Sequence, residues 1–274
     1  MAYLTRLRGS RGRLLSRLRE GYWRAKSTLL YEYAYRLARL EYTLQSGIPV
    51  RVASMGEWWV YNDIFVEGEY DSAIALALEA PSSTQELSVL DLGANVGFFA
   101  LRVADRMLRA GNKGITATIT LVEGSPRVFA ELKRRLDVQR LPFSSVRLIH
   151  GLVGMRSGTG VIHESAVHVK NTIVGPEGAA GRHVPYVDLV KAMEDIPSVD
   201  LLKCDIEGAE RLFVDNYGDL LSKVKRAVFE LHHDLCDTHA CVAGLRSSGF
   251  QEVMVRQSGN RSLALFSRTA SSHK

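Results

Sequence analysis

Residues 89–97, VLDLGANVG, decide the fold of this 274-residue chain. Three of the first four residues are apolar, which is typical of a parallel strand that is buried on both faces. Gly93 and Gly97 allow a tight turn and let the main chain approach a ligand closely. Residues 98–108 then have the pattern of a helix, whose first N–H groups point back toward the turn. The stretch therefore predicts a strand, a site for a nucleotide-like cofactor and a helix.

Glu123 ends the next predicted strand, residues 115–122 (ITATITLV), which is rich in β-branched residues. It follows the glycine turn by one βαβ unit, where an acidic residue binds ribose hydroxyls in nucleotide-binding proteins. A glutamate at a strand end is by itself usually an ordinary solvent-facing residue, and a glycine turn alone is a weak signal. The two features at this spacing are much more specific than either one.

Composition limits the class of protein. The chain is 46% hydrophobic and 24% charged, as is usual for a soluble globular protein. No apolar run approaches the ~18 residues that cross a bilayer, and the N-terminus lacks the apolar core of a secretory signal. Cys204, Cys236 and Cys241 are too few for a disulfide framework. We therefore expect a cytoplasmic protein with free thiols and no membrane span.

The positive charge is concentrated at the N-terminus. Residues 1–40 contain ten arginines or lysines and two glutamates, which gives them a charge of +8. Because the whole chain has a net charge of +5, the remaining residues carry −3. Arginines alternate with leucines here, which predicts an amphipathic helix that continues into residues 31–43. This helix could contact nucleic acid or a membrane, cover an anionic substrate, or pack on the main domain or a second subunit. We favour the last interpretation, which leaves a homo-oligomer through this helix open.

The chain divides into three predicted parts, with a polar turn at residues 81–86 as the clearest boundary. They are a basic amphipathic helical segment (1–47), an accessory segment of strands and a helix (48–86), and the main domain (87–274). Within the accessory segment we expect short strands or a hairpin at residues 50–53, 57–61 and 64–66, and then a helix through Leu78. Its clustered aromatic residues could form a pocket wall or pack as a layer.

From residue 87 onward, strand patterns alternate with helix patterns. This regularity predicts an α/β domain with a parallel, doubly wound sheet and helices on both faces. A glycine-rich stretch interrupts it at residues 153–186, where we expect a hairpin with strands near 160–163 and 167–174.

Two later strands end in acidic residues or histidines. Residues 200–210, DLLKCDIEGAE, place Asp205, Glu207 and Glu210 at one strand end, and the strand at residues 226–231 is followed by His232 and His233. Ligands bind open α/β sheets beyond the carboxyl ends of their strands. Each residue has an ordinary explanation, such as an acid at a helix N-terminus or a polar strand end. That both strands end this way is better explained by a site.

The order of these motifs resembles the FkbM family of S-adenosylmethionine-dependent methyltransferases. The matching segments are VLDLGANVGFFA, LVEGSP, DLLKCDIEGAE and FELHH, which span roughly residues 87–267. Gly124 departs from the family pattern, in which proline is usual. Residues 1–47 match no signature of the family.

The resemblance implies a Rossmann-like, seven-stranded class I methyltransferase sheet that ends in a reversed hairpin near residues 251–256 and 262–267. It implies that the glycine turn approaches the methionine part of the cofactor S-adenosyl-L-methionine, whose product is S-adenosyl-L-homocysteine. Glu123 would hold the ribose, and the adenine would lie between the turn after Glu123 and residues 150–153. The implied cofactor-binding set is Asp91, Gly93, Asn95, Gly97, Glu123, Gly124, Ser125, Gly151, Leu152 and Asp205.

The resemblance also favours methylation of a hydroxyl on a small molecule, such as a sugar, a polyketide or another secondary metabolite. The sulfonium is already electrophilic, so the protein must hold the acceptor in line and remove its proton. We expect His232, Glu207 and Asp205 to be catalytic. His232 is the preferred base because imidazole titrates near neutral pH, although a structural role for it is almost as well supported. Glu230 and His233 are expected to bind the acceptor.

Several alternatives stay open. We expect no metal, but Asp205, Glu207, Glu230 and His232 could together bind a divalent cation. The histidines and cysteines of residues 232–241 are zinc-ligand types without a standard zinc spacing. The enzyme could instead methylate nitrogen on a small molecule or peptide, or act on nucleic acid through its basic arm, or bind the cofactor without catalysis. Nucleic acid is disfavoured because the main domain is acidic.

Overall fold

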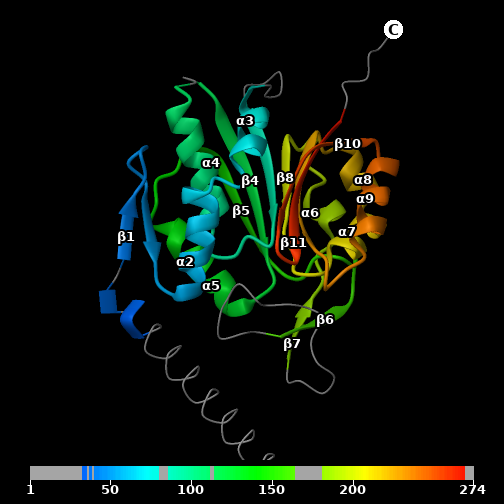
Figure 1. The fold of residues 1–274 in the computed structure, drawn as a ribbon, viewed down its shortest axis with the longest axis horizontal. Coiled ribbons are helices and arrows are strands. Elements are labelled where there is room, and N and C mark those ends of the chain that lie inside the picture. The colour runs from blue at the N-terminus through cyan, green and yellow to red at the C-terminus, as the bar shows by residue number, and fades with distance from the viewer. Residues whose placement is uncertain are drawn as a thin grey trace, which may run out of the picture.

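The computed structural model describes residues 33–35, 37–38, 40–79, 86–111, 114–163 and 181–268. A seven-stranded mixed sheet forms its centre, with the strand order β10–β11–β9–β8–β3–β4–β5 (Figure 1). The strands from β5 to β9 in this order are parallel, and β11 runs antiparallel to β9. This is the predicted Rossmann-like class I methyltransferase sheet. Its strands are β3 (Glu86–Leu92), β4 (Thr116–Glu123), β5 (Phe143–His150), β8 (Leu201–Cys204), β9 (Arg226–His232), β10 (Phe250–Ser258) and β11 (Arg261–Arg268).

The central strand β3 is buried on both faces, as its apolar run predicts. Leu87 and Val89 belong to the apolar cluster on one side of the sheet, and Leu90 and Leu92 to the cluster on the other side. Successive side chains of a strand point to opposite faces, so one strand supplies both cores.

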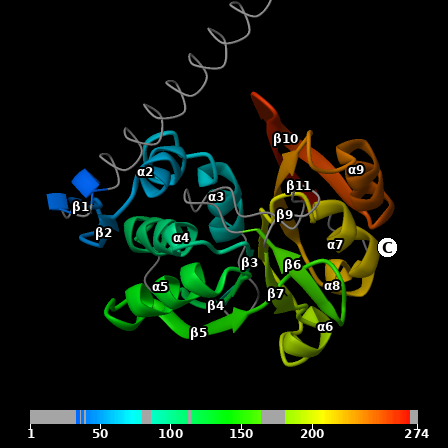
Figure 2. The same ribbon diagram turned by 90° about the horizontal axis from the view of Figure 1, so that it is seen from below.

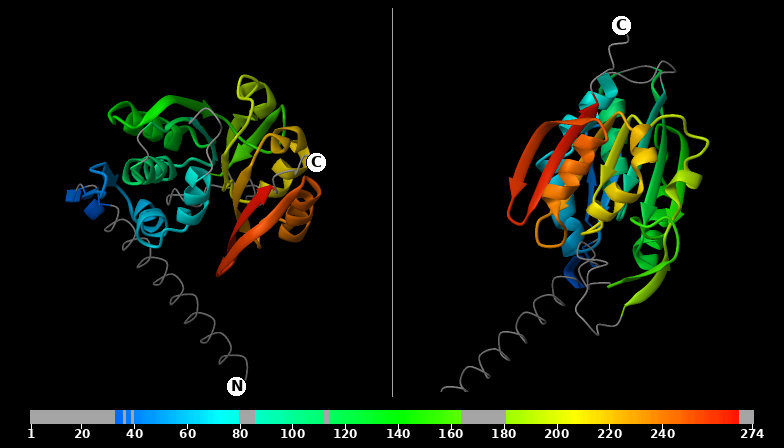
Figure 3. Two further views of the ribbon diagram at one scale, coloured as in Figure 1. Left: turned by 90° about the horizontal axis from the view of Figure 1, so that it is seen from above. Right: turned by 90° about the vertical axis from the view of Figure 1, so that its right-hand side faces the viewer.

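Helices cover both faces of the sheet (Figures 2 and 3). On one face lie α3 (Asp71–Glu79), α4 (Phe98–Arg109) and α5 (Pro126–Asp137), and on the other lie α6 (Leu189–Ala192), α7 (Glu210–Asn216), α8 (Gly218–Ser222) and α9 (Thr238–Ser247). The start of α5 is well defined, because the Ser125 side chain accepts a hydrogen bond from the backbone of Val128 and a proline follows Ser125.

The N-terminal segment and the accessory segment each differ from the prediction in one place. Residues 40–43, expected as helix, form strand β1 (Leu40–Thr43), which pairs with β2 (Pro49–Val52). Residues 57–61 and 64–66, expected as strands, lie in α2 (Met55–Tyr61) and in the π-helix η1 (Asn62–Val66). Ser54 caps α2 by accepting a hydrogen bond from the Glu57 backbone, and the buried Glu57 side chain pairs with Arg135 of α5. A serine three residues before a glutamate is a helix-start signal, and here it outweighs the strand-like aromatic pattern.

Two hairpins complete the fold. The predicted terminal hairpin is present as β10 and β11 at one edge of the sheet (Figure 3). A second hairpin joins β6 (Thr159–Ile162) to β7 (Arg182–Pro185) and lies below the sheet in Figure 1. The strand expected at residues 167–174 lies outside the described residues, and the partner of β6 is β7 instead.

Most of the basic N-terminal segment lies outside the described residues, so its amphipathic helix and its part in an oligomer stay predictions. Among the residues that the structure describes, no helix is long and apolar enough to cross a membrane. The three cysteines, which all lie within the described ranges, are free, as expected.

Candidate active site

The turn after β3 is built around glycine. Gly93 has a φ of +76°, and a Cβ atom there would lie 1.7 Å from the carbonyl oxygen of Asp205. The turns that follow β3 and β8 therefore meet backbone to backbone, and any side chain at this position would force them apart. Gly97, with a φ of +88°, lies at the start of α4 beneath Leu132 of α5.

Glu123 ties this turn to the end of β4. One carboxylate oxygen accepts a hydrogen bond from the backbone N–H of Asn95 and the other from that of Ser125, both at 2.8 Å. Burial raises the pKa of Glu123 to about 7, although the two N–H groups act to lower it. Each carboxylate oxygen has more than one acceptor site. The carboxylate can therefore bind a ligand hydroxyl while it holds the turn.

A narrow cleft, here called the glycine cleft, opens beside Glu123. It is lined by Gly93, Asn95, Val122, Glu123, Gly124, Val128, Gly151, Leu152, Val153, Ile162, Asp205, Ile206 and Glu207. Seven of these belong to the expected cofactor-binding set. The other three members of that set, Asp91, Gly97 and Ser125, do not line the cleft. Ser125 and Asp91 are fully buried; the Ser125 side chain accepts a hydrogen bond from the backbone of Val128, which lines the cleft, and Asp91 pairs with Lys203.

Lys203 is a buried cation to which the sequence motifs assign no role. It lies beside Asp91 in the register of β8 with β3, and its Nζ is 3.2 Å from an Asp91 carboxylate oxygen. Nζ also donates to the Gly93 carbonyl at 2.8 Å and lies 3.5 Å from an Asp205 oxygen. Burial acts to lower the pKa of Lys203, but the two aspartates raise it above its ordinary value, so the ammonium stays charged. A lysine inside an apolar strand, next to a strand that contains a buried aspartate, is the sequence signal for this pair.

His232, at the end of β9, sits among carboxylates. Its Nδ1 is 3.1 Å from an oxygen of Glu210, which is fully buried, and its Nε2 is 3.5 Å from Glu207 and 3.6 Å from Glu230. Burial acts to lower the pKa of His232, but the hydrogen bond to Glu210 and the charges of Asp205 and Glu207 raise it to about 10. The pKa values of Glu207 and Glu230 are raised in turn, mainly by burial. Protons are therefore shared within this group at neutral pH.

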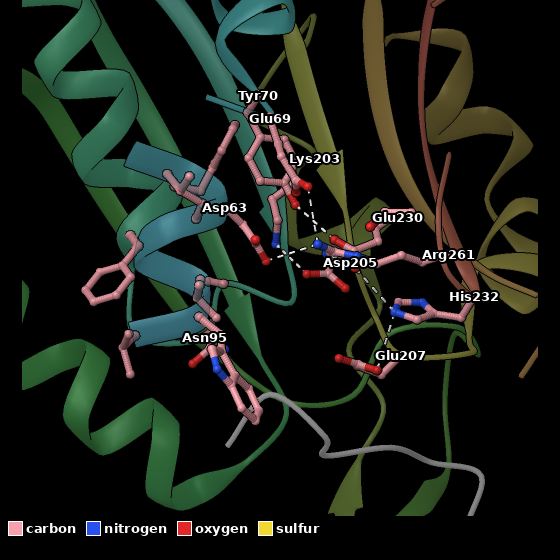
Figure 4. Close-up of a pocket in the computed structure, with 18 of the residues that line it drawn as sticks. Asp63, Glu69, Tyr70, Asn95, Lys203, Asp205, Glu207, Glu230, His232 and Arg261 are labelled. Carbon is pink, nitrogen blue, oxygen red and sulfur yellow. Dashed lines mark hydrogen bonds and ion pairs between the residues drawn. The ribbon is translucent and has the colours of Figure 1, made fainter. Parts of the chain in front are cut away.

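A larger cavity of about 530 Å³, here called the acidic cavity, lies on the other side of the turn (Figure 4). Its aromatic side chains are Trp59, Tyr70, Phe98 and Phe99, and its carboxylates are Asp63, Glu69, Asp205, Glu207, Glu230 and Asp234. Three basic side chains, Lys203, Arg261 and His232, also line it. The predicted aromatic pocket wall is thus partly present, since Trp59 and Tyr70 line the cavity, whereas Trp58 and Tyr61 stack on each other beside it.

Arg261 holds one end of the acidic cavity together. Its guanidinium pairs with Glu230, with Asp63 at 3.0 Å and with Glu69 at 3.2 Å. Tyr70 donates a hydrogen bond to the other oxygen of Glu230 at 3.3 Å. Asp63, Glu69, Tyr70 and Arg261 were not among the expected site residues. No local motif marks them, because they meet only when the accessory segment packs against β9 and β11.

Four of the five expected catalytic and acceptor-binding residues meet at the acidic cavity, and one does not. Asp205, Glu207, Glu230 and His232 line it, and Figure 4 shows Glu207 and His232 pointing toward one another. His233 does not line it, because its ring lies on the hydroxyl of Thr238, 3.1 Å away. Among the described residues, the group that brings three ligand atoms within metal-binding range consists of Asp205, Glu207 and His232.

The glycine cleft and the acidic cavity share a wall, formed by Asn95, Asp205 and Glu207. Asn95 and Glu207 both adopt left-handed backbone conformations, with φ of +49° and +52°. Such conformations are uncommon outside glycine and are often found at functional sites. The Asn95 side-chain oxygen is buried and has no hydrogen-bond partner among the described residues. The two spaces therefore adjoin at Asn95, Asp205 and Glu207.

No protein-family model matches the chain, and no curated protein does. Solved structures with a similar fold include magnesium protoporphyrin IX methyltransferase from Synechocystis PCC 6803 with bound SAH, at 15% identity over 77% of this chain and 88% of that chain, with a TM-score of 0.44. Another is precorrin-6y C5,15-methyltransferase from Geobacter metallireducens GS-15, at 15% identity over 73% of this chain and 88% of that one, with a TM-score of 0.41.

Proposed function

We propose that the protein is an S-adenosylmethionine-dependent methyltransferase that methylates a hydroxyl group of a small molecule such as a sugar or polyketide. The observation that carries this proposal is the wall of Asn95, Asp205 and Glu207 between the glycine cleft and the acidic cavity. A methyl donor and its acceptor need two binding spaces that meet at one point. The motifs that resemble the FkbM family lie on both sides of that point.

The residues of the glycine cleft fit the cofactor. Glu123 would offer carboxylate acceptors to the two ribose hydroxyls, and the turn at Gly93, which also lines the cleft, would approach the methionine part. Asn95, whose side-chain oxygen has no hydrogen-bond partner among the described residues, lines both spaces. The bound cofactor would supply an electrophilic methyl group on a sulfonium, and the rest of the chemistry falls to the protein.

The acidic cavity would hold the acceptor and receive its proton. A hydroxyl acceptor would have to lose its proton as it received the methyl group, so a proton acceptor must lie beside it. Asp205 and Glu207 lie at the shared wall, and His232 lies beside Glu207 in the cavity, so we propose that this group takes up that proton. Glu230, held by Arg261 and Tyr70, would bind and orient the acceptor.

The charge of the acidic cavity argues against nucleic acid as the acceptor. Six carboxylates line it against three basic side chains, each of which is already paired with a carboxylate. The carboxylates would repel a polyanion, and no unpaired basic side chain of the cavity would attract it. The same charges would tolerate an amine, so nitrogen methylation of a small molecule is the alternative that the experiment must separate.

Calorimetric titration of S-adenosylhomocysteine into the full chain tests the cofactor half of the proposal. We expect binding by the wild type and a loss of at least tenfold in affinity for Glu123→Ala. Glu252→Ala is the matched control, because Glu252 is a carboxylate of strand β10 that lines neither space. Absence of binding by the wild type, or equal effects of the two variants, would contradict the proposal.

Methyl transfer to panels of glycosides and matched amino sugars tests the acceptor. We expect mass spectrometry and NMR to detect methyl ethers of the glycosides. We expect no methylated product from an amino sugar whose amine is the only group available. Products methylated only on nitrogen would sustain the enzyme class and overturn the hydroxyl acceptor.

A further inference from the structure

The acidic cavity contains a set of ligand atoms that lie close enough together to hold one cation. Asp205, Glu207 and His232 each present one oxygen or nitrogen atom, and these atoms all lie within 4.8 Å of one another. Ligands of one six-coordinate Mg²⁺ or Mn²⁺ lie about 3 Å apart when adjacent and about 4.2 Å apart when opposite, given metal–ligand distances of about 2.1 Å. Small side-chain rotations would bring the three atoms onto one ion.

The ring of His232 is held as metal-bound histidines usually are. Glu210 contacts Nδ1 at 3.1 Å, which leaves Nε2 directed toward the carboxylates of Glu207 and Glu230. Glu210 is fully buried and is fixed by the backbone N–H groups of Ile206 and Gly208. A carboxylate on the far nitrogen of a metal-binding histidine sets its tautomer and orientation. Because Glu210 is not one of the three ligands, this contact is separate support for the site.

A second observation concerns Asp205. Its Oδ1 is buried and has no hydrogen-bond partner among the described residues. Its other oxygen is 3.5 Å from Lys203, so the pair with that cation does not use Oδ1. A buried carboxylate oxygen without a donor is costly, and a bound cation would satisfy it.

We propose that Asp205, Glu207 and His232 form a binding site for a divalent cation with mixed oxygen and nitrogen ligands, such as Mn²⁺ or Mg²⁺. The existence of the site does not depend on the proposed function. Its role does, because at the shared wall the cation would fix the acceptor oxygen beside the methyl group.

Titration of Mn²⁺ into the full chain, followed by the loss of the free-Mn²⁺ signal in electron paramagnetic resonance, tests the site. We expect one ion per chain and at least tenfold weaker binding for Glu207→Gln and for His232→Gln. Asp234→Asn is the matched control, because Asp234 lines the same cavity but is not in the ligand set, and its affinity should equal that of the wild type. Asp205→Asn replaces either variant that fails to fold in thermal unfolding.

A wild type that leaves the Mn²⁺ signal unchanged would overturn the site, and so would an Asp234→Asn variant as impaired as Glu207→Gln. S-adenosylhomocysteine binding is measured on the same samples. Binding of Mn²⁺ without binding of S-adenosylhomocysteine would refute the proposed function but not the cation site. Binding of S-adenosylhomocysteine without binding of Mn²⁺ would refute only the cation site.

Discussion

The glycine cleft and the acidic cavity share a wall but are built from different materials. The cleft is formed largely by backbone, with glycines at the close approaches and Glu123 held by two main-chain N–H groups. The cavity is formed by charged side chains from the accessory segment, β8, β9 and β11, such as Asp63 and Arg261, which are 198 residues apart. Backbone geometry is set by short motifs, whereas a network of charges depends on how distant segments pack. The first is therefore readable from a sequence and the second is not.

The largest expected effect concerns the backbone contact that forms the cleft. Gly93→Ala places a Cβ 1.7 Å from the Asp205 carbonyl, and neither strand end can move away without breaking the sheet. We expect loss of S-adenosylhomocysteine binding in calorimetry and a free energy of unfolding lowered by about 3 kcal/mol or more.

Gly111→Ala is the control, because Gly111 also has a positive φ but meets nothing within 4 Å. It should cost about 1 kcal/mol and leave binding intact. A Gly93→Ala variant that binds S-adenosylhomocysteine as tightly as the wild type would show that the cleft is not defined by its backbone.

Lys203 joins the two regions, so its removal should disturb both. Lys203→Met leaves the buried Asp91 without its cation, and we expect the free energy of unfolding in urea to fall by about 3 to 5 kcal/mol. The double variant Lys203→Met with Asp91→Asn should recover a large part of this loss, because no buried charge is then left alone. Equal stability of the single and double variants would mean that the two side chains are not coupled.

The affinity of the cleft for S-adenosylhomocysteine should depend on pH. The pKa of Glu123 is raised to about 7, so the carboxylate is ionised above that pH and protonated below it. Only the ionised form has acceptors for both ribose hydroxyls, so the affinity should be full near pH 8 and fall about tenfold by pH 6. Glu123→Gln should bind about tenfold more weakly at pH 8 and lose this dependence. A wild type and a variant with parallel pH profiles would remove Glu123 from the ribose site.

The smallest expected effect lies in the cavity. Tyr70→Phe removes one hydrogen bond to Glu230, which Arg261 also holds, so we expect a loss of about 1 kcal/mol in unfolding free energy. S-adenosylhomocysteine affinity should not change, while the Michaelis constant for the acceptor should rise. A weakened cofactor affinity would show that the two regions are less separate than their construction indicates.

The part of the site predicted from the sequence follows this division. Gly93, Asn95 and Glu123 line the cleft, and Asp205, Glu207 and His232 line the cavity, because each follows a strand whose end the topology brings to one edge of the sheet. The same rule predicts His233 at the cavity, but its ring contacts the hydroxyl of Thr238 instead. Successive side chains along an extended chain point to opposite faces, so His233 does not follow His232 into the cavity. The aromatic residues of α2 have a period of two and predict a strand, whereas its capping residues indicate the helix that the structure contains.

The sequence by itself determined the sheet, the glycine turn and the identity of the acidic strand ends, because local spacing controls strands, turns and the positions of strand ends. Only the tertiary structure decided that Lys203 neutralises Asp91, that Arg261 gathers Asp63, Glu69 and Glu230, and that Glu210 fixes the ring of His232. These pairings form across strands and between segments far apart in the chain. Their partners are chosen by burial, since an ionised group that leaves water must find an opposite charge or share a proton.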